Sequence, residues 1–146
     1  MLSPSLEDYL EELYRFSLTT PTVRVTDLST KLHVKLPSVT KALHRLKDLN
    51  YIKYEPYGEI ELTEMGRDKG TFLVKRNKLL LEFLTLICSD CNVEAEAEAM
   101  EHYLCAATIA AIDNLVAFAR SRPEWYGQFL QYLGQTSESE LTPPKA

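Results

Sequence analysis

The chain has 146 residues, of which 45% are hydrophobic and 25% charged, as is typical of a folded protein with room for one domain or two small ones. Its apolar runs are far shorter than the roughly 18 residues that a membrane-spanning helix needs, and its acidic start lacks the features of a signal peptide. The three cysteines disfavour a closed disulfide framework, so we expect a cytoplasmic protein with no membrane partner.

The net charge of −5 is distributed unevenly along the chain. Residues 21–53 hold seven cations and two carboxylates, whereas residues 81–146 hold three cations and ten carboxylates. A basic segment indicates a polyanionic partner such as nucleic acid. An acidic segment indicates either a bound cation or simply a solvated surface.

The N-terminal region predicts three helices. The first begins after Ser3, has Pro4 in its first turn, and runs to about residue 17. Residues 23–25 form a candidate short strand, and Thr26 is the predicted cap of a second helix that ends near residue 32. A turn and a third helix over residues 36–50 follow, so this region predicts a helix-turn-helix.

The helix over residues 36–50 has two contrasting faces. Val39, Leu43 and Leu46 recur at helical spacing and form a stripe that must be buried. The remaining surface carries hydroxyls and cations, which contact base edges and phosphates when such a helix enters a major groove. An ordinary solvated basic face has the same pattern. The predicted DNA-binding residues are Lys35, Pro37, Ser38, Thr40, Lys41, His44, Arg45 and Lys47.

Two short strands are predicted next, over residues 51–54 and 60–62, with Pro56 and Gly58 in the turn between them. A hairpin directly after a helix of this kind is a wing. The prediction is therefore a winged helix-turn-helix domain over residues 1–70 that binds double-stranded DNA.

The rest of the chain predicts only helices. Thr63 caps a long helix that reaches about residue 87, and a break precedes a helix over residues 94–104. A helix over residues 106–119 is rich in small and apolar residues, which suits packing against a second subunit. Pro123 begins the last helix, and Gly134 ends it.

The predicted fold class is thus mainly α, with a C-terminal all-helical domain for dimerisation and metal sensing over residues 71–134. The polar tail over residues 135–146 is predicted to be disordered.

Glu98, Glu101 and His102 are spaced i, i+3 and i+4, so all three share one helix face. Two carboxylates and an imidazole suit a divalent cation of intermediate hardness, such as Mn²⁺ or Fe²⁺. Asp8 and Glu11 on the first helix have the side chains to complete such a site. The alternating glutamates and alanines that precede Glu98 are equally typical of a solvated helical face.

Four stretches carry a family resemblance: SPSLEDYLEEL near the start, LPSVTK in the third helix, YIKYEPYGEIELTEMG across the wing, and EAMEHYL in the acidic helix. With these stretches, residues 3 to 133 resemble the DtxR/MntR metal-dependent transcriptional repressors, in the short manganese-regulator form without an SH3-like domain. The resemblance implies a homodimer in which metal binding orders the two recognition helices for a DNA operator. The ligands that it implies are Asp8, Glu11, Glu98, Glu101 and His102.

The chain departs from this family at one expected ligand, because Asn77 stands where the family has a histidine. An amide oxygen coordinates as a neutral and weaker donor, so the sequence leaves one or two ions per subunit open. Leu81 stands where some family members have a carboxylate, and we therefore expect no ancillary site.

The cysteines offer a competing scheme. Cys88 and Cys91, followed by His102 and Cys105, have a spacing that suits a tetrahedral Zn²⁺. The two schemes compete for His102, and the family resemblance accounts for this residue in the carboxylate site.

The preferred function is a repressor that binds DNA in response to Mn²⁺, Fe²⁺ or another divalent transition metal, with its first helix loosely placed until the metal binds. The alternative is a metal-independent winged-helix regulator with a degenerate site. An enzyme is not expected, because the sequence has no glycine-rich phosphate loop and no nucleophile elbow.

Overall fold

The computed structural model describes residues 1–136, so most of the predicted disordered tail lies outside the described residues. The helices are α1 (Pro4–Thr19), α2 (Val25–Leu32), α3 (Leu36–Asp48), α4 (Glu64–Leu86), α5 (Val93–Glu101), α6 (Ala106–Ser121) and α7 (Pro123–Gln135), and the strands are β1 (Ile52–Tyr54) and β2 (Ile60–Leu62). This confirms a mainly helical fold with a winged helix-turn-helix. In the described range, no helix combines the length and apolar character needed to cross a membrane.

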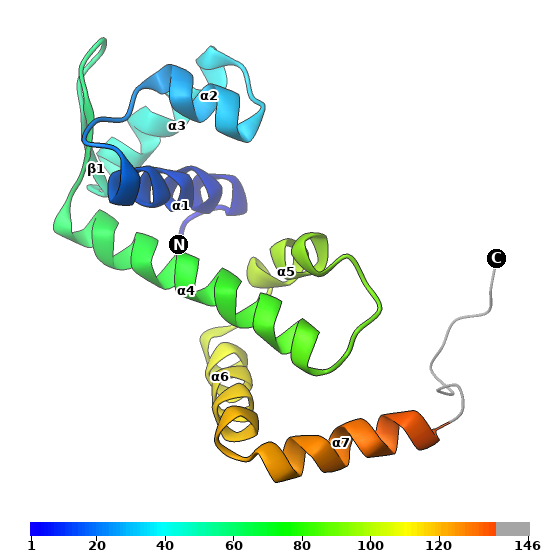
Figure 1. Ribbon diagram of the computed structural model, residues 1–146. Coiled ribbons are helices and arrows are strands. Elements are labelled where there is room, and N and C mark those ends of the chain that lie inside the picture. Colours follow the sequence, from blue (N-terminus) through cyan, green and yellow to red (C-terminus); the bar gives the residue numbers. More distant parts are fainter. Residues whose placement is uncertain (137–146) are drawn as a thin grey trace.

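The long helix α4 is the axis of the molecule (Figure 1). Helices α1, α2 and α3 and the hairpin gather over its first half, α5 lies along its second half, and α6 and α7 extend from its other side. Helix α1 packs on α4 and also contacts α2 and α3. Helix α1 is therefore the element that joins the helix-turn-helix to α4.

Two of the predicted helix boundaries hold because local capping groups fix them. Ser3 Oγ accepts a hydrogen bond from the backbone N–H of Leu6 at the start of α1, and Thr63 Oγ1 accepts one from Gly66 at the start of α4. The prediction that Thr26 caps α2 is wrong. Arg24 is the capping residue and helix α2 begins at Val25, two residues earlier than predicted, because the Asp27 carboxylate accepts the N–H of Arg24 at 2.8 Å.

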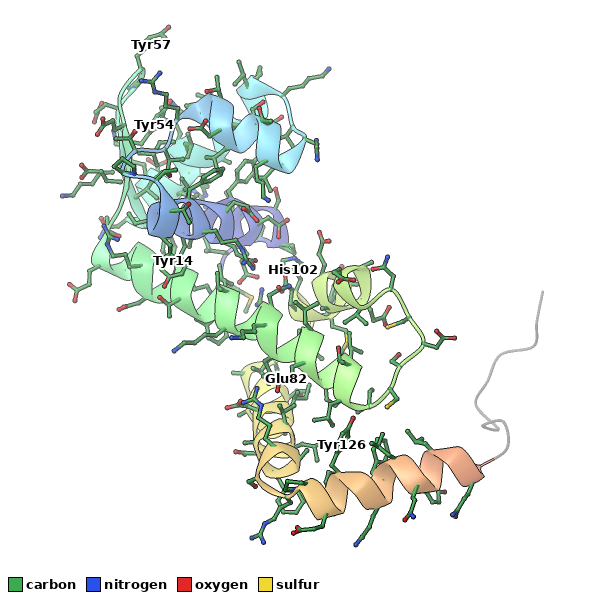
Figure 2. The ribbon with its side chains drawn as sticks, viewed as in Figure 1. Tyr14, Tyr54, Tyr57, Glu82, His102 and Tyr126 are labelled. Carbon is green, nitrogen blue, oxygen red and sulfur yellow. The ribbon has the colours of Figure 1, made fainter. Side chains whose placement is uncertain are left out.

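The wing is a three-residue antiparallel pairing in which Ile52 faces Leu62 and Tyr54 faces Ile60. Residues 23–25 do not form a strand of their own: Val23 makes a single bridge to Ile60. The turn between the strands ends in an exposed tip at Tyr57, which lies far from α4 (Figure 2).

Two hydrophobic cores share α4. The N-terminal core joins α1, α2, α3 and the hairpin, and Leu73 is the contribution of α4 to it. The C-terminal core joins α4, α5 and α6 around Leu80 and Leu84. The side chains of Arg76 and Asn77 thus lie where the two cores meet. The division into domains at residue 70 falls inside the continuous helix α4 and stays a prediction.

Two glycines in the first turns of α4 allow other backbone segments to approach closely. A Cβ at Gly70 would lie 2.6 Å from the Cβ of Tyr14 in α1, and a Cβ at Gly66 would overlap the carbonyl oxygen of Tyr51. Glycine lowers helix propensity, but here it permits the contact between α1 and α4.

Gly70→Ala should therefore destabilise the protein by about 1–3 kcal/mol, because the added methyl group forces α1 away from α4. Gly127→Ala in α7 is the matched control, since no atom lies within 4 Å of its added Cβ. The free energy of unfolding of the control should rise by about 0.5–1 kcal/mol, because alanine has a higher helix propensity than glycine. Urea denaturation of both variants measures the difference, and equal stabilities would contradict close α1–α4 packing at Gly70.

Candidate metal centre and nucleic-acid interface

Three of the predicted ligands converge where α1, α4 and α5 meet. The ligand atoms of Asp8, Glu101 and His102 lie within 4.8 Å of one another. Nε2 of His102 is 3.2 Å from Oδ1 of Asp8 and 3.7 Å from Oε1 of Glu101. Figure 2 shows His102 between α1 and α5, beside α4. Two carboxylates and one imidazole nitrogen at a single point are a donor set that fits a divalent cation.

The end of α5 places two of these side chains. The helix ends at Glu101, three residues before the predicted end, because the N–H groups of Tyr103 and Leu104 both donate to the carbonyl of Met100. His102 is therefore the residue that caps the helix, and its ring reaches α1. Asp8 is held on the facing helix, where the buried Leu10 and Leu13 anchor α1 in the N-terminal core.

The cluster carries negative charge that the surrounding side chains only partly compensate. Burial raises the pKa of Asp8, and the carboxylates of Glu98 and Glu11 raise it further against the effect of His102. Burial also raises the pKa of Glu101, whose side chain is only 3% exposed, and the Glu11 carboxylate adds to this shift. A divalent cation at this point would supply the missing positive charge.

A buried carboxylate that sequence reasoning missed lies behind His102. Oε2 of Glu7 accepts a hydrogen bond from Nη2 of Arg76 at 2.9 Å and lies 3.2 Å from Nδ1 of His102. Nζ of Lys69 lies 3.3 Å from the other oxygen. Burial raises the pKa of Glu7, but the hydrogen bonds and charges of Arg76, His102 and Lys69 outweigh it, so the pKa is lowered.

The other predicted ligands surround the cluster without joining it. Glu11, Asn77 and Glu98 line the same hollow as Asp8 and Glu101, together with the charged residues Glu12, Arg15, Lys31 and Glu94, which sequence reasoning missed. Glu98 is exposed, and Oε1 of Glu11 accepts a hydrogen bond from Arg15 at 2.7 Å.

Asn77 meets the cluster through its nitrogen. Its Nδ2 donates to Oε2 of Glu101 at 3.2 Å. Because an ionised carboxylate only accepts hydrogen bonds, Asn77 must present its NH₂ group to Glu101, and its amide oxygen is not the atom that makes this contact.

The cysteines do not join His102 in the part of the chain that the structure describes. Cys88 and Cys105 are exposed, and Cys91 is half-buried. The group of possible metal ligands within residues 1–136 contains Asp8, Glu101 and His102 but no cysteine. Both ring nitrogens of His102 already face carboxylates, which disfavours the zinc scheme.

Helix α3 presents the predicted DNA contacts on its open side, while Val39, Leu43 and Leu46 are fully buried as predicted. Six of the predicted contacts are exposed and two are half-buried. The exposed ones are Lys35, Pro37, Ser38, Lys41, His44 and Arg45, and the half-buried ones are Thr40 and Lys47.

Hollows flank α3 on both sides. The one toward α1 is lined by Ser38, Lys41, His44 and Arg45 and also by Ser5 at the start of α1. The one toward the wing is lined by Thr40 and by three residues that sequence reasoning missed, namely Arg24, Thr26 and Tyr57.

Contacts within the protein tie part of this surface to the wing. Nζ of Lys47 lies 2.8 Å from Oε1 of Glu55, and the ring of His44 meets the Tyr54 ring edge-on at 5.6 Å. The hairpin therefore fixes the position of α3 side chains as well as extending the surface. The fold thus presents an exposed helix with several cations, α3, beside a wing. The carboxylate–imidazole cluster lies on the other side of α1, the helix that packs on α3.

Family models match both parts of the chain. Residues 1–60 match the N-terminal DNA binding domain of the iron dependent repressors, and residues 63–125 match their metal binding and dimerisation domain. The HTH-type transcriptional regulator MntR of Listeria welshimeri is 36% identical over 125 residues, which cover 85% of this chain and 88% of that protein. MntR of Geobacillus kaustophilus is 39% identical over 119 residues, which cover 81% of this chain and 84% of that protein.

Solved structures have the same fold. The manganese regulator SloR aligns over 80% of this chain with a TM-score of 0.70 and 21% sequence identity. A manganese-dependent transcriptional repressor in complex with manganese aligns over 77% of this chain, also with a TM-score of 0.70, and with 24% sequence identity. The matches span 55% and 53% of those two chains. Since the family models account for residues 1–60 and 63–125 and the relatives match over most of their length, this chain belongs to the iron-dependent repressor family of metal-dependent, DNA-binding transcriptional repressors.

Proposed function

We propose that this protein is a cytoplasmic, homodimeric repressor that binds one Mn²⁺ ion per subunit through Asp8, Glu101 and His102 and binds its DNA operator only with the ion in place. The observation that carries this proposal is the convergence of Asp8 from α1 with Glu101 and His102 from the end of α5. This convergence joins the helix-turn-helix side of the molecule to the side that carries α5 and α6.

A bound divalent cation would supply the positive charge that Asp8 and Glu101 lack. The chain itself links this site to the DNA-binding surface. Helix α1 carries Asp8 and packs on α3, where Leu10 and Leu13 share the N-terminal core with Leu43 and Leu46. Holding Asp8 against α5 therefore fixes the orientation of α3 relative to α4 and α6. In a dimer, this orientation sets the spacing of the two recognition helices, and metal and DNA strengthen each other's binding by the same factor.

An apolar surface on α6 and α7 supports the homodimer. Leu115 and Phe118 on α6 and Leu130, Tyr132 and Leu133 on α7 are exposed in the single chain. Several exposed large apolar side chains on adjoining helices are typical of a subunit interface.

The donor set favours Mn²⁺ or Fe²⁺. Carboxylates with one imidazole suit these ions, whereas thiolates, which soft metals prefer, are not part of the described cluster. Mn²⁺ is our first choice because two regulators with the same fold are described as a manganese regulator and as a manganese-dependent repressor. The metal-independent alternative is not favoured, since the chain matches the metal binding and dimerisation domain of the family.

Operator binding tests this function. In fluorescence anisotropy with a family-type palindromic duplex at fixed salt, we expect wild-type protein to bind with Mn²⁺ and to bind at least about tenfold more weakly in EDTA. Glu101→Gln should remain weak with Mn²⁺, because a neutral amide replaces a charged ligand. The same titration with Fe²⁺, Co²⁺ and Zn²⁺ ranks these ions by the operator affinity that each supports.

Thermal denaturation of the same variants separates metal binding from DNA binding. Mn²⁺ at about 100 times its Kd should add about 2.7 kcal/mol to the stability of the wild type, and Glu101→Gln should lose most of this gain. Glu124→Gln, an equal charge change on an exposed residue of α7, should behave as wild type. Operator binding that is unchanged by EDTA would overturn the proposed function.

Lys41→Ala should weaken operator binding by about 1–3 kcal/mol, because Lys41 is exposed on α3 beside Ser38 and Arg45. The thermal shift with Mn²⁺ should stay unchanged, since Lys41 is not part of the ligand cluster. Lys75→Ala, an exposed lysine of α4, is the control for charge. Equal losses of affinity in the two variants, or an equal loss of metal and DNA binding in Lys41→Ala, would contradict the assignment.

Asn77→His should raise the number of Mn²⁺ ions per subunit from one to two, because an imidazole beside Glu101 is a stronger donor than the amide. Titration calorimetry measures this stoichiometry. Gln128→His on the exposed surface of α7 controls for metal binding to any added histidine. Two ions on the wild type, or one on Asn77→His, would show that Asn77 does not limit the site.

A further inference from the structure

Glu7 is a buried carboxylate that the proposed ligand set leaves out. Its side chain is only 10% exposed. Its Oε1 lies 3.3 Å from Nζ of Lys69, and its Oε2 lies 2.9 Å from Nη2 of Arg76 and 3.2 Å from Nδ1 of His102. Both oxygens are engaged by these partners, so Glu7 is not available as a metal ligand.

The contact with Glu7 determines which nitrogen of His102 faces the ligand cluster. Arg76 and Lys69 keep the carboxylate ionised, and an ionised carboxylate accepts hydrogen bonds but does not donate them. Nδ1 of His102 therefore carries the proton in this contact. Nε2 lies 3.2 Å from Asp8 and 3.7 Å from Glu101, so a cation bound between these carboxylates would take the lone pair of Nε2, and the proton on Nδ1 would be the one that Glu7 accepts.

Arg76 in turn holds Glu7 in place. Arg76 is 7% exposed and lies on the buried face of α4 between Leu73 and Leu80. A buried guanidinium needs a carboxylate partner, and Glu7 is the one that reaches it from α1. The chain of contacts from Arg76 through Glu7 to His102 thus links α4, α1 and the end of α5.

We propose that Glu7, held by Arg76, is a positioning residue that orients His102 so that Nε2 faces the ion shared with Asp8 and Glu101. A histidine ligand whose second nitrogen donates to a carboxylate is fixed in both tautomer and ring orientation. This inference rests on the proposed function of Asp8, Glu101 and His102 as ligands.

The sharpest variant combines Glu7→Leu with Arg76→Met. It removes the carboxylate and its buried cation together, so the net charge is unchanged, and Lys69, the other partner of Glu7, is partly exposed to solvent. The Kd for Mn²⁺, measured by competition with a fluorescent chelator, should rise about ten- to a hundredfold. In metal-free protein at pH 8, the ¹⁵N chemical shifts of the His102 ring should move away from the Nδ1–H form expected in the wild type.

Glu124→Gln is the matched control. Glu124 is exposed on α7, away from the ligand cluster, and its replacement removes one negative charge without touching His102. Its Kd for Mn²⁺ should stay within about twofold of wild type, and the ring shifts should not change. Circular dichroism and thermal denaturation in EDTA establish that each variant is folded.

A folded double variant with wild-type ring shifts and wild-type Kd would overturn the proposal. If the double variant does not fold, Glu7→Gln, which keeps the shape but not the charge, decides by the same two readouts. If wild-type protein binds no Mn²⁺, the proposed function fails, while the ring shifts of metal-free protein still show whether Glu7 sets the tautomer of His102.

Discussion

The structure depends on how charge is buried where α1, α4 and α5 meet. In the described part of the chain, the buried charged residues are Glu7, Glu11, Arg76 and Glu101, each at most 7% exposed. Burying an ionised group costs several kcal/mol unless a partner compensates it. Arg76 compensates the charge of Glu7, and the half-exposed Arg15 compensates that of Glu11. Glu101, by contrast, contacts the neutral amide of Asn77 and the imidazole of His102. Negative charge is therefore in excess at this junction, which is the condition that a divalent cation relieves.

The same junction explains how a small ion can influence a DNA-binding surface. Helix α4 contributes to both hydrophobic cores, and its 23 residues span roughly 35 Å. The close approach of Tyr14 to Gly70 and the Glu7–Arg76 pair anchor α1 on α4 through contacts that involve no predicted ligand. We therefore expect metal binding to adjust the orientation of α1 and α3, and the loosely placed first helix stays a prediction that these contacts do not favour.

The sequence predicts most of this fold because its signals are local. The caps at Ser3 and Thr63 and the helix start at Pro123 need only neighbouring residues. Glu7 and Arg76 were missed because they are 69 residues apart, although each interrupts an apolar stripe: Leu10 follows Glu7 at i+3, and Leu73 and Leu80 flank Arg76. Such an interruption signals a buried charge, but helical periodicity does not identify its partner. Spacing likewise grouped Glu98 with Glu101, and both lie on α5, but Glu98 is exposed whereas Glu101 is buried.

Two consecutive residues of α4 give this helix a specific part in the site. Arg76 orients Glu7, which contacts His102, and Asn77 donates to Glu101. In the arrangement that we propose, α4 supplies no ligand but orients two of the three. The geometry available to the ion then depends on the position of α4 against α1, and the contact of Gly70 with Tyr14 fixes that position less than two helical turns from Arg76. Under this proposal, helix packing and metal affinity are coupled, and a change in the α1–α4 contact would alter the site even when every ligand is kept.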